Sequence, residues 1–343
     1  MRTALIVGAA GTELSPDEVR FLKDARPAGF ILFARNLKDH AQIRALISDV
    51  RAAIGADDVL VLIDQEGGRV QRLRPPLGRA LPPAAAYGAL YAGDREVALA
   101  AAFEATRLLA ADLVDLGINT DCAPVLDLPV PGSHDIIGDR AYGRTVDQVV
   151  ALAKAVADGF MAGGVVPVIK HIPGHGRATA DSHLALPVVT EPREELIASD
   201  FAPFKALSHL PAAMSAHVVF RAIDPDEPAS TSPIIIRDVI RGLIGFDGLL
   251  MSDDLSMKAL SGPMRQRAEA VIAAGSDLAL HCNGDMAEMV DAAAGSGRLE
   301  GRAKERFDTA LNITKATQPF DSAAAEAQLA KVLAFAAGAA ESV

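Results

Sequence analysis

Short apolar segments alternate along the chain with longer segments in which apolar residues recur every three or four positions. The short segments are rich in valine, isoleucine and leucine, which is typical of strands that are buried on both faces. The predicted strands are residues 3–8, 30–33, 59–64, 119–123, 165–171, 212–218, 249–253 and 278–282. The pattern therefore predicts a parallel sheet covered by helices.

The helical pattern fills the gaps between these strands. Gly117, Gly163, Gly245 and Gly275 each follow a helical run, where a helix often ends in the left-handed conformation. The predicted helices are residues 16–24, 39–54, 96–116, 146–163, 191–207, 233–243, 264–274 and 286–294. Regular alternation of strand and helix in this number favours a closed (β/α)8 TIM-type barrel of the α/β class over an open doubly wound sheet.

Two alanine-rich helices are predicted after the last barrel unit, at residues 302–315 and 322–339. No low-complexity linker and no internal repeat marks a boundary along the sequence. We therefore expect residues 1–343 to form a single catalytic barrel domain, with the C-terminal helices of residues 302–343 packed on the outside of the barrel.

Composition and charge narrow the classes of function. Half of the 343 residues are hydrophobic and 22% are charged, as in a soluble globular protein with a sizeable core. The net charge of -11 argues against nucleic acid or an anionic membrane surface as a partner. Cys122 and Cys282 lie far apart in apolar segments, which indicates buried thiols rather than a disulfide.

Targeting and cofactor motifs are weak in this sequence. The apolar run at residues 3–8 is too short for a signal peptide, and no run of about eighteen apolar residues occurs, so we expect a cytoplasmic protein. The segment from Gly8 to Gly11 lacks the full glycine pattern of a dinucleotide site, and we expect no cofactor.

In a barrel of this kind, functional residues lie at the carboxyl ends of the strands. Asp64 follows a run of apolar residues at the end of the third predicted strand. Because an unpaired carboxylate is costly to bury, Asp64 needs a partner such as an arginine or a hydroxyl group of a ligand. Asp253 ends the seventh strand, and a carboxylate at the mouth of a barrel can act as a nucleophile.

The segment after the fifth strand, residues 170–183, has the sequence KHIPGHGRATADSH. Its proline and glycines break both periodicities and predict a loop, and loops on a rigid scaffold often carry catalytic groups. Gly174 and Gly176 flank His175, so we expect this loop to move during the catalytic cycle.

The pattern Lys-His-x-Pro-Gly-His-Gly followed by Asp-x-His resembles the signature of glycoside hydrolase family 3, specifically its single-domain bacterial β-N-acetylhexosaminidases. Three further blocks resemble the same family: DQEGGRVQR at residues 64–72, IGDRAY at 137–142 and SDDLSM at 252–257. The chain departs from the usual family pattern at Asp139, Ile172 and Ser215, where many relatives carry Glu, Phe and Pro.

The resemblance implies roles for particular residues. It assigns Asp253 as the nucleophile, His183 as the acid/base and Asp181 as the carboxylate that orients the His183 imidazole. An imidazole with a pKa of about 6.5 suits both donation and removal of a proton near neutrality. The residues that the resemblance assigns to sugar binding are Asp64, Arg72, Arg140, Lys170 and His171.

Four other polar residues near the strand ends are interpreted as structural. Asp121 and Asp127 are expected to anchor the loop after the fourth strand. Asp254 is expected to point away from Asp253, because successive side chains of a strand face opposite sides. His217, on an apolar strand, is expected to be a hydrogen-bonded core residue.

The activity that the resemblance implies is a retaining exo-β-N-acetylglucosaminidase acting through a covalent glycosyl-aspartate. It would release the terminal non-reducing β-1,4-linked N-acetylglucosamine from 1,6-anhydro-N-acetylmuramic acid, with or without peptide, in peptidoglycan recycling. The implied partner is a small-molecule substrate, and we expect a monomer.

Several alternatives stay open at this level. His171, His175, Asp181 and His183 could bind zinc, but their spacing matches no compact zinc pattern and Lys170 would repel a cation, so we expect no metal. Asp253 and Asp254 could instead assist a reaction in which the substrate acetamide is the nucleophile. A β-N-acetylglucosaminide phosphorylase and a non-catalytic sugar-binding barrel are the remaining alternatives.

Overall fold

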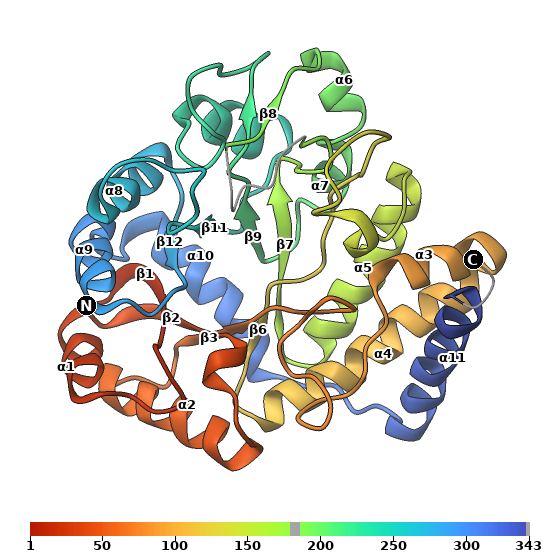
Figure 1. Ribbon diagram of the computed structural model, residues 1–343, viewed down its shortest axis with the longest axis horizontal. Coiled ribbons are helices and arrows are strands. Elements are labelled where there is room, and N and C mark those ends of the chain that lie inside the picture. Colours follow the sequence, from red (N-terminus) through yellow and green to blue (C-terminus); the bar gives the residue numbers. More distant parts are fainter. Residues whose placement is uncertain (179–185, 341–343) are drawn as a thin grey trace.

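The structure, a computed structural model, describes residues 1–178 and 186–340, with side chains as far as residue 338. Eight parallel strands of the described chain close into a barrel in the order β1-β12-β11-β9-β7-β6-β3-β2 (Figure 1). Their bounds are β1 Thr3–Gly8, β2 Pro27–Leu32, β3 Leu60–Ile63, β6 Thr120–Asp121, β7 Val166–Ile172, β9 Ala212–Ser215, β11 Leu249–Asp254 and β12 Leu278–His281. The predicted (β/α)8 barrel is confirmed, and each predicted strand overlaps an observed one.

Helices surround this barrel (Figure 1). They are α1 Pro16–Ala25, α2 His40–Ile54, α3 Ala84–Gly93, α4 Arg95–Asp115, α5 Val146–Ala162, α6 Arg193–Ala198, α7 Ala202–Ala206, α8 Met264–Ala274, α9 Met286–Ser296, α10 Gly301–Asn312 and α11 Ser322–Ala340, with a π-helical segment at Ile235–Leu243. Among the described residues, no helix combines the length and the apolar composition needed to cross a membrane.

The prediction of one continuous helix over residues 191–207 is wrong, because the chain forms α6 and α7 with a break between them. Ser199 leaves the helical conformation with φ -122° and ψ -82°. Pro203 has no N–H to donate, so it stands in the first turn of α7 rather than inside a longer helix. The break buries Asp200, whose carboxylate accepts a 2.7 Å hydrogen bond from Arg177.

The predicted left-handed helix ends are found at Gly117, Gly245 and Gly275, whose φ angles are 86°, 77° and 114°. Gly163 is the exception, because its φ is -87° and the left-handed position falls on Gly164 instead. The helix α5 ends at Ala162, and the left-handed glycine follows one residue later in the chain than the pattern predicts.

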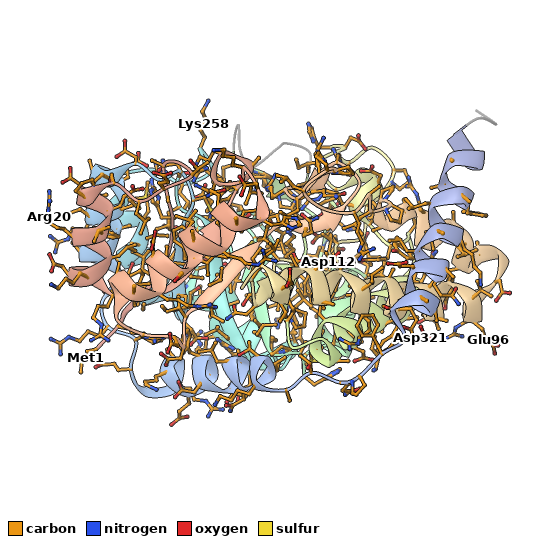
Figure 2. All side chains as sticks on the ribbon, turned by 90° about the horizontal axis from the view of Figure 1, so that it is seen from below. Met1, Arg20, Glu96, Asp112, Lys258 and Asp321 are labelled. Atoms are coloured by element: carbon orange, nitrogen blue, oxygen red, sulfur yellow. The ribbon has the colours of Figure 1, made fainter. Side chains whose placement is uncertain are left out.

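Two cores hold the barrel together. Residues such as Ile6, Val168 and Met251 fill the interior of the barrel, while their neighbours along the strands, such as Leu5, pack outward against the helices. Phe307 of α10 belongs to the interior core, so α10 closes one end of the barrel. Figure 2 shows α10 along the face opposite Lys258, a residue of the loop that follows β11. The helix α11 packs against α3 and α4.

In the part of the chain that the structure describes, two short sheets lie outside the barrel ring. The strands β4 Gln65–Gly67 and β5 Val70–Gln71 form an antiparallel hairpin directly after β3, and β8 Val188–Val189 pairs with β10 Val219–Phe220. Cys122 and Cys282 are buried free thiols, as predicted. The β4–β5 hairpin extends the chain beyond the carboxyl end of β3, where functional residues are expected.

Asp121 ends β6 and is fully buried, with its Oδ1 atom accepting a 3.0 Å hydrogen bond from the Gln65 backbone. The contact agrees with a structural role for Asp121, but the segment that it holds follows β3 and is not the predicted loop after the fourth strand. Burial raises the pKa of Asp121 to about 8, although the Gln65 hydrogen bond and the charge of Lys170 oppose the increase. The carboxyl group is therefore largely protonated in the folded protein at neutral pH.

The fold makes a prediction for the helix that closes the barrel. Replacing Phe307 by alanine leaves a cavity and should lower the free energy of unfolding by about 3–5 kcal/mol. Phe335 on α11 is 41% exposed, and its replacement by alanine should change stability by less than about 0.5 kcal/mol. Urea unfolding of both variants measures the difference, and equal losses would contradict the assignment of α10 to the interior core.

A second prediction concerns the pH dependence of stability. The pKa of Asp121 rises from its ordinary value of 3.8 to about 8 on folding, so between these pH values the folded protein binds more protons than the unfolded chain. The stability that Asp121 contributes is thus fully present below pH 3.8 and is lost as the pH rises toward about 8. Asp121→Asn removes this titration. When the pH is raised from 5 to 8, the free energy of unfolding of the variant should therefore increase by about 1 kcal/mol or more relative to that of wild type. Denaturant unfolding at both pH values that shows parallel changes in the two proteins would rule this out.

Candidate active site

A pocket of about 290 Å³ opens at the carboxyl ends of the barrel strands. Its inner end is formed by barrel residues such as Ile31, Met214 and Leu280. The pocket brings together all five residues predicted to bind sugar and the predicted nucleophile, namely Asp64, Arg72, Arg140, Lys170, His171 and Asp253. Its volume is near the lower end of the range of about 300–1,000 Å³ for small-molecule sites, so it suits a compact ligand.

Five charged side chains form a continuous chain of ion pairs along the pocket. Asp64 accepts hydrogen bonds from Arg72 at 3.0 Å and from the Lys170 Nζ atom at 2.9 Å. The same Nζ atom lies 2.6 Å from Glu66. Glu66 in turn accepts two 2.8 Å hydrogen bonds from Arg140, through Nε and a terminal nitrogen. Cations and anions therefore alternate from Arg72 to Arg140.

The charges of this cluster stabilise one another against burial. Burial by itself would raise the pKa of Asp64, but Lys170 and Arg72 outweigh it and hold that pKa well below its usual range. In the same way, Lys170 and Arg140 lower the pKa of Glu66 to about 2 against the effect of burial. Burial would lower the pKa of Lys170, yet Asp64 and Glu66 raise it. These groups are therefore charged at neutral pH.

The β4–β5 hairpin positions two members of the cluster. Gly67 has φ 102°, and a Cβ atom there would collide with the backbone oxygen of Pro82, so the tight turn requires glycine. The side-chain oxygen of Gln65 accepts hydrogen bonds from the backbone of Arg72 at 3.0 Å and of Leu73 at 2.9 Å. These contacts hold the backbone of Arg72 against Gln65, the residue between Asp64 and Glu66.

An irregularity in β7 turns two successive residues toward the pocket. Consecutive side chains of a regular strand face opposite sides, yet both Lys170 and His171 line the pocket. The pairing of β7 with β9 shifts between Lys170 and Ile172, which allows this arrangement. Ile172 is fully buried in the outer core, so its difference from the family's usual Phe keeps an apolar contact.

Asp127 anchors the loop that follows β7. Its Oδ2 atom lies 2.7 Å from His171 Nδ1, and its Oδ1 atom accepts a 2.7 Å hydrogen bond from the His175 backbone. Burial would raise the pKa of Asp127, but His171 and His175 lower it, so the carboxylate is charged. Because Nδ1 of His171 faces this carboxylate, Nε2 is the ring atom left for a ligand. The prediction that Asp127 is a structural anchor is confirmed.

Asp253 and Asp254 end β11, and both contribute to the pocket wall. Asp254 accepts hydrogen bonds from the backbone of Ser256 at 3.0 Å and of Cys282 at 3.1 Å. The structural role predicted for Asp254 is confirmed by these contacts, although the prediction that it points away from the site is wrong. The turn after Asp254 draws its carboxylate onto β12, so the alternation of a regular strand ends here.

His217 is a hydrogen-bonded core residue, as predicted. Its Nδ1 atom lies 2.6 Å from the Ser230 hydroxyl and its Nε2 atom 3.1 Å from the Asp254 carbonyl oxygen. Burial lowers the pKa of His217, so the ring is neutral at physiological pH. Both ring nitrogens make hydrogen bonds within the protein, which supports a structural role for His217 rather than a role in ligand binding.

Asp181 and His183, the predicted acid/base pair, lie outside the described residues. The segment that leads to them is packed against the body of the protein. A Cβ atom on Gly176 would collide with the backbone of Leu128, and Arg177 pairs with Asp200 at 2.7 Å. Gly176 therefore allows the loop to pack closely on Leu128. Movement of the loop stays a prediction.

Reasoning from the sequence gave no role to Glu66 and considered His175 only as a possible zinc ligand, yet both residues line the pocket. Glu66 lies two positions after Asp64, and this spacing places both side chains on one face of an extended segment. The spacing is the sequence feature that could have indicated Glu66 as a pocket residue. His175 is 3% exposed, and burial together with the charge of His171 lowers its pKa to about 4. His175 is thus a neutral imidazole in the pocket wall.

Two smaller expectations concern pairing and metal binding. Asp139 pairs with Arg69 at 2.8 Å, so the shorter acidic side chain of this chain contacts the β4–β5 hairpin rather than Arg140. Within residues 1–178 and 186–338, no group of three or more histidine, cysteine or acidic side chains is arranged to hold a metal ion.

Comparisons with known proteins agree with this geometry. A family model described as the glycosyl hydrolase family 3 N-terminal domain matches residues 5–312. A protein of Methylococcus capsulatus named Beta-hexosaminidase is 44% identical over 277 residues, which cover 80% of each chain.

Solved structures extend the similarity over the barrel. A family 3 beta-N-acetylglucosaminidase from Paenibacillus sp. FPU-7 has a TM-score of 0.85 at 31% identity, covering 96% of this chain and 66% of that longer one. NagZ from Neisseria gonorrhoeae, in complex with N-trifluoroacetyl-D-glucosamine, has a TM-score of 0.85 at 32% identity and 98% coverage of both chains. With its sequence blocks, its barrel and its pocket in agreement, the chain belongs to glycoside hydrolase family 3.

Proposed function

We propose that this family 3 β-N-acetylhexosaminidase releases a terminal β-linked N-acetylglucosamine by a retaining double displacement, with Asp253 as the nucleophile. The observation that carries the proposal is the presence of Asp253 and five residues suited to bind sugar in one pocket. The similarity to NagZ, which is solved with an N-acylated glucosamine, supports the choice of sugar.

The pocket suits a sugar at the end of a chain. Its inner end is closed by apolar residues of the barrel interior, among them Ile31 and Leu280, so a ligand enters from one side. Its walls alternate donors such as Lys170 and Arg140 with acceptors such as Asp64. Because each sugar hydroxyl both donates and accepts, an alternating wall binds several hydroxyls at once.

The chemistry requires a nucleophile and a proton donor on opposite sides of the reacting bond. The Asp253 carboxylate attacks the anomeric carbon and forms a glycosyl ester, while the leaving oxygen takes a proton. We assign that proton to His183 and its orientation to Asp181, and both assignments rest on the family resemblance. Water then hydrolyses the ester, with the imidazole acting as base in the second step.

We infer the natural substrate and setting from the same resemblance. The substrate is the β-1,4 linkage of N-acetylglucosamine to 1,6-anhydro-N-acetylmuramic acid, with or without peptide, in peptidoglycan recycling. The chain acts as a monomeric, single catalytic domain in the cytoplasm. The match to NagZ over nearly the full length of both chains supports this inference.

Covalent trapping tests the nucleophile. A 2-deoxy-2-fluoro glycosyl donor with a good leaving group should add one glycosyl unit to the wild-type protein, because fluorine slows hydrolysis of the ester. Peptide mass spectrometry should place the adduct on Asp253. The Asp253→Asn variant should form no adduct and lose at least about 10³-fold in kcat on a chromogenic N-acetylglucosaminide. Asp308→Asn, a change at an exposed position on α10, serves as the control.

Failure of trapping in an enzyme that turns over the chromogenic substrate would favour the alternative in which the acetamide is the nucleophile. Absence of any turnover would favour a sugar-binding barrel without catalysis.

Product analysis distinguishes hydrolysis from phosphorolysis. With inorganic phosphate present, the enzyme should release free N-acetylglucosamine, and NMR should detect no sugar 1-phosphate. Asp64 and Glu66 already pair with the three cations of the cluster, and Asp253 and Asp254 add negative charge to the same pocket, so phosphate should not replace water as the acceptor. Accumulation of the 1-phosphate, with a rate that rises with phosphate concentration, would replace hydrolysis by phosphorolysis as the activity.

A further inference from the structure

Glu66 is the member of the charged cluster to which neither the sequence nor the proposed mechanism gives a role. Its carboxylate contacts Lys170 and Arg140, two residues that come from different parts of the chain. We propose that Glu66 is a positioning residue that holds the Lys170 ammonium and the Arg140 guanidinium in the orientation that binds the sugar. This inference rests on the proposed function of the pocket.

The hydrogen bonds of Arg140 support this role. Its Nε atom and one terminal nitrogen donate to the two oxygens of Glu66, and the other terminal nitrogen donates to the Ile136 carbonyl oxygen at 3.1 Å. Among the described residues, Glu66 is the only carboxylate within salt-bridge distance of Arg140. A bidentate contact fixes the plane of a guanidinium, so the N–H groups that remain have a defined direction.

Lys170 depends on Glu66 in a different way. The ammonium group has three N–H donors, of which one is directed to Asp64 and one to Glu66. The third donor is then fixed in direction and available to a ligand in the pocket. If Glu66 no longer accepted, the ammonium would keep Asp64 alone and could rotate away from the ligand.

The location of Glu66 explains why it can join the two cations. It lies on β4, between Lys170 on β7 and Arg140 at the end of a short helical turn, Gly138–Arg140. Its side chain is 6% exposed and forms part of the pocket wall. No other described carboxylate contacts both cations, so Glu66 couples the β7 side of the pocket to the loop that carries Arg140.

The alternative is that Glu66 only stabilises the fold through its ion pairs. Asp277 provides a control for this alternative. Asp277 has a 4% exposed side chain and accepts hydrogen bonds from Arg241 at 2.8 Å and Arg306 at 2.9 Å. It precedes β12, at the amino end of the barrel and away from the pocket. Glu66 and Asp277 are thus both buried carboxylates shared by two cations. Asp277 lies away from the site and also accepts a 2.8 Å hydrogen bond from the Leu250 backbone.

The experiment measures steady-state kinetics and thermal unfolding of Glu66→Gln, Glu66→Asp and Asp277→Asn. Glutamine keeps the shape of Glu66, but it has no charge and only one acceptor oxygen. If that oxygen takes the Oε1 position, which accepts from both cations, the N–H₂ group faces the Arg140 Nε donor and the bidentate contact is lost. KM for a chromogenic N-acetylglucosaminide should rise about 10- to 100-fold in Glu66→Gln, with a smaller change in kcat, since the lost contacts orient binding groups. Glu66→Asp retains the charge and should give an intermediate KM.

Asp277→Asn should lower the unfolding temperature while KM stays within about twofold of wild type. A folded Glu66→Gln protein with wild-type KM would overturn the proposal, as would an equal increase of KM in Asp277→Asn. If Glu66→Gln does not fold, Glu66→Asp decides the question by the same comparison.

The role of Glu66 can be tested even if the proposed enzymatic activity is wrong. If the wild-type protein does not hydrolyse the chromogenic substrate, the proposed activity fails. The role of Glu66 is then measured by calorimetric titration of N-acetylglucosamine, and the dissociation constant should rise about 10- to 100-fold in Glu66→Gln. Equal dissociation constants in the two proteins would overturn it.

Discussion

The burial of the Lys170 ammonium group between two carboxylates is the interaction on which the rest of the site depends. Its side chain is 2% exposed, and an isolated ammonium in such a place would lose its proton or remain outside. Asp64 and Glu66 keep it charged, and each of them needs a second cation for the same reason. Arg72 and Arg140 meet that need, so the five side chains act as one unit.

The closed barrel is what allows this unit to form. Asp64, Lys170 and Asp253 are far apart in the sequence, but parallel strands bring their carboxyl ends to one side of the barrel. The interior core and α10 fill the opposite end, which leaves the pocket at the strand ends. The rigidity of the barrel therefore holds the cluster and the predicted nucleophile in fixed relation.

The buried carboxylates of the strand ends fall into two groups. Asp64 and Glu66 are paired with charged side chains that line the pocket. Asp127 and Asp254 accept hydrogen bonds from backbone N–H groups and hold the loops that carry pocket residues, and Asp127 also pairs with the His171 side chain. The backbone contacts of this second group orient the site, and Asp254 also lines the pocket.

The barrel could be predicted from the sequence because its strands are continuous apolar segments, and their ends also located Asp64, Lys170 and Asp253. Elements without such a pattern were missed. The helix α3 is rich in alanine and glycine and has no amphipathic stripe, and the break at Ser199 falls within a helical periodicity. The hairpin that positions Glu66 depends on a glycine turn and side-chain contacts, which periodicity does not reveal.

A crystal structure with N-acetylglucosamine bound would decide whether the charged cluster and Asp253 form one sugar site. We expect the sugar to lie in the pocket, with its hydroxyls within hydrogen-bond distance of Lys170 and Arg140 and its anomeric carbon facing the Asp253 carboxylate. A sugar bound in the pocket with its anomeric carbon turned away from Asp253, or bound elsewhere on the barrel, would contradict it.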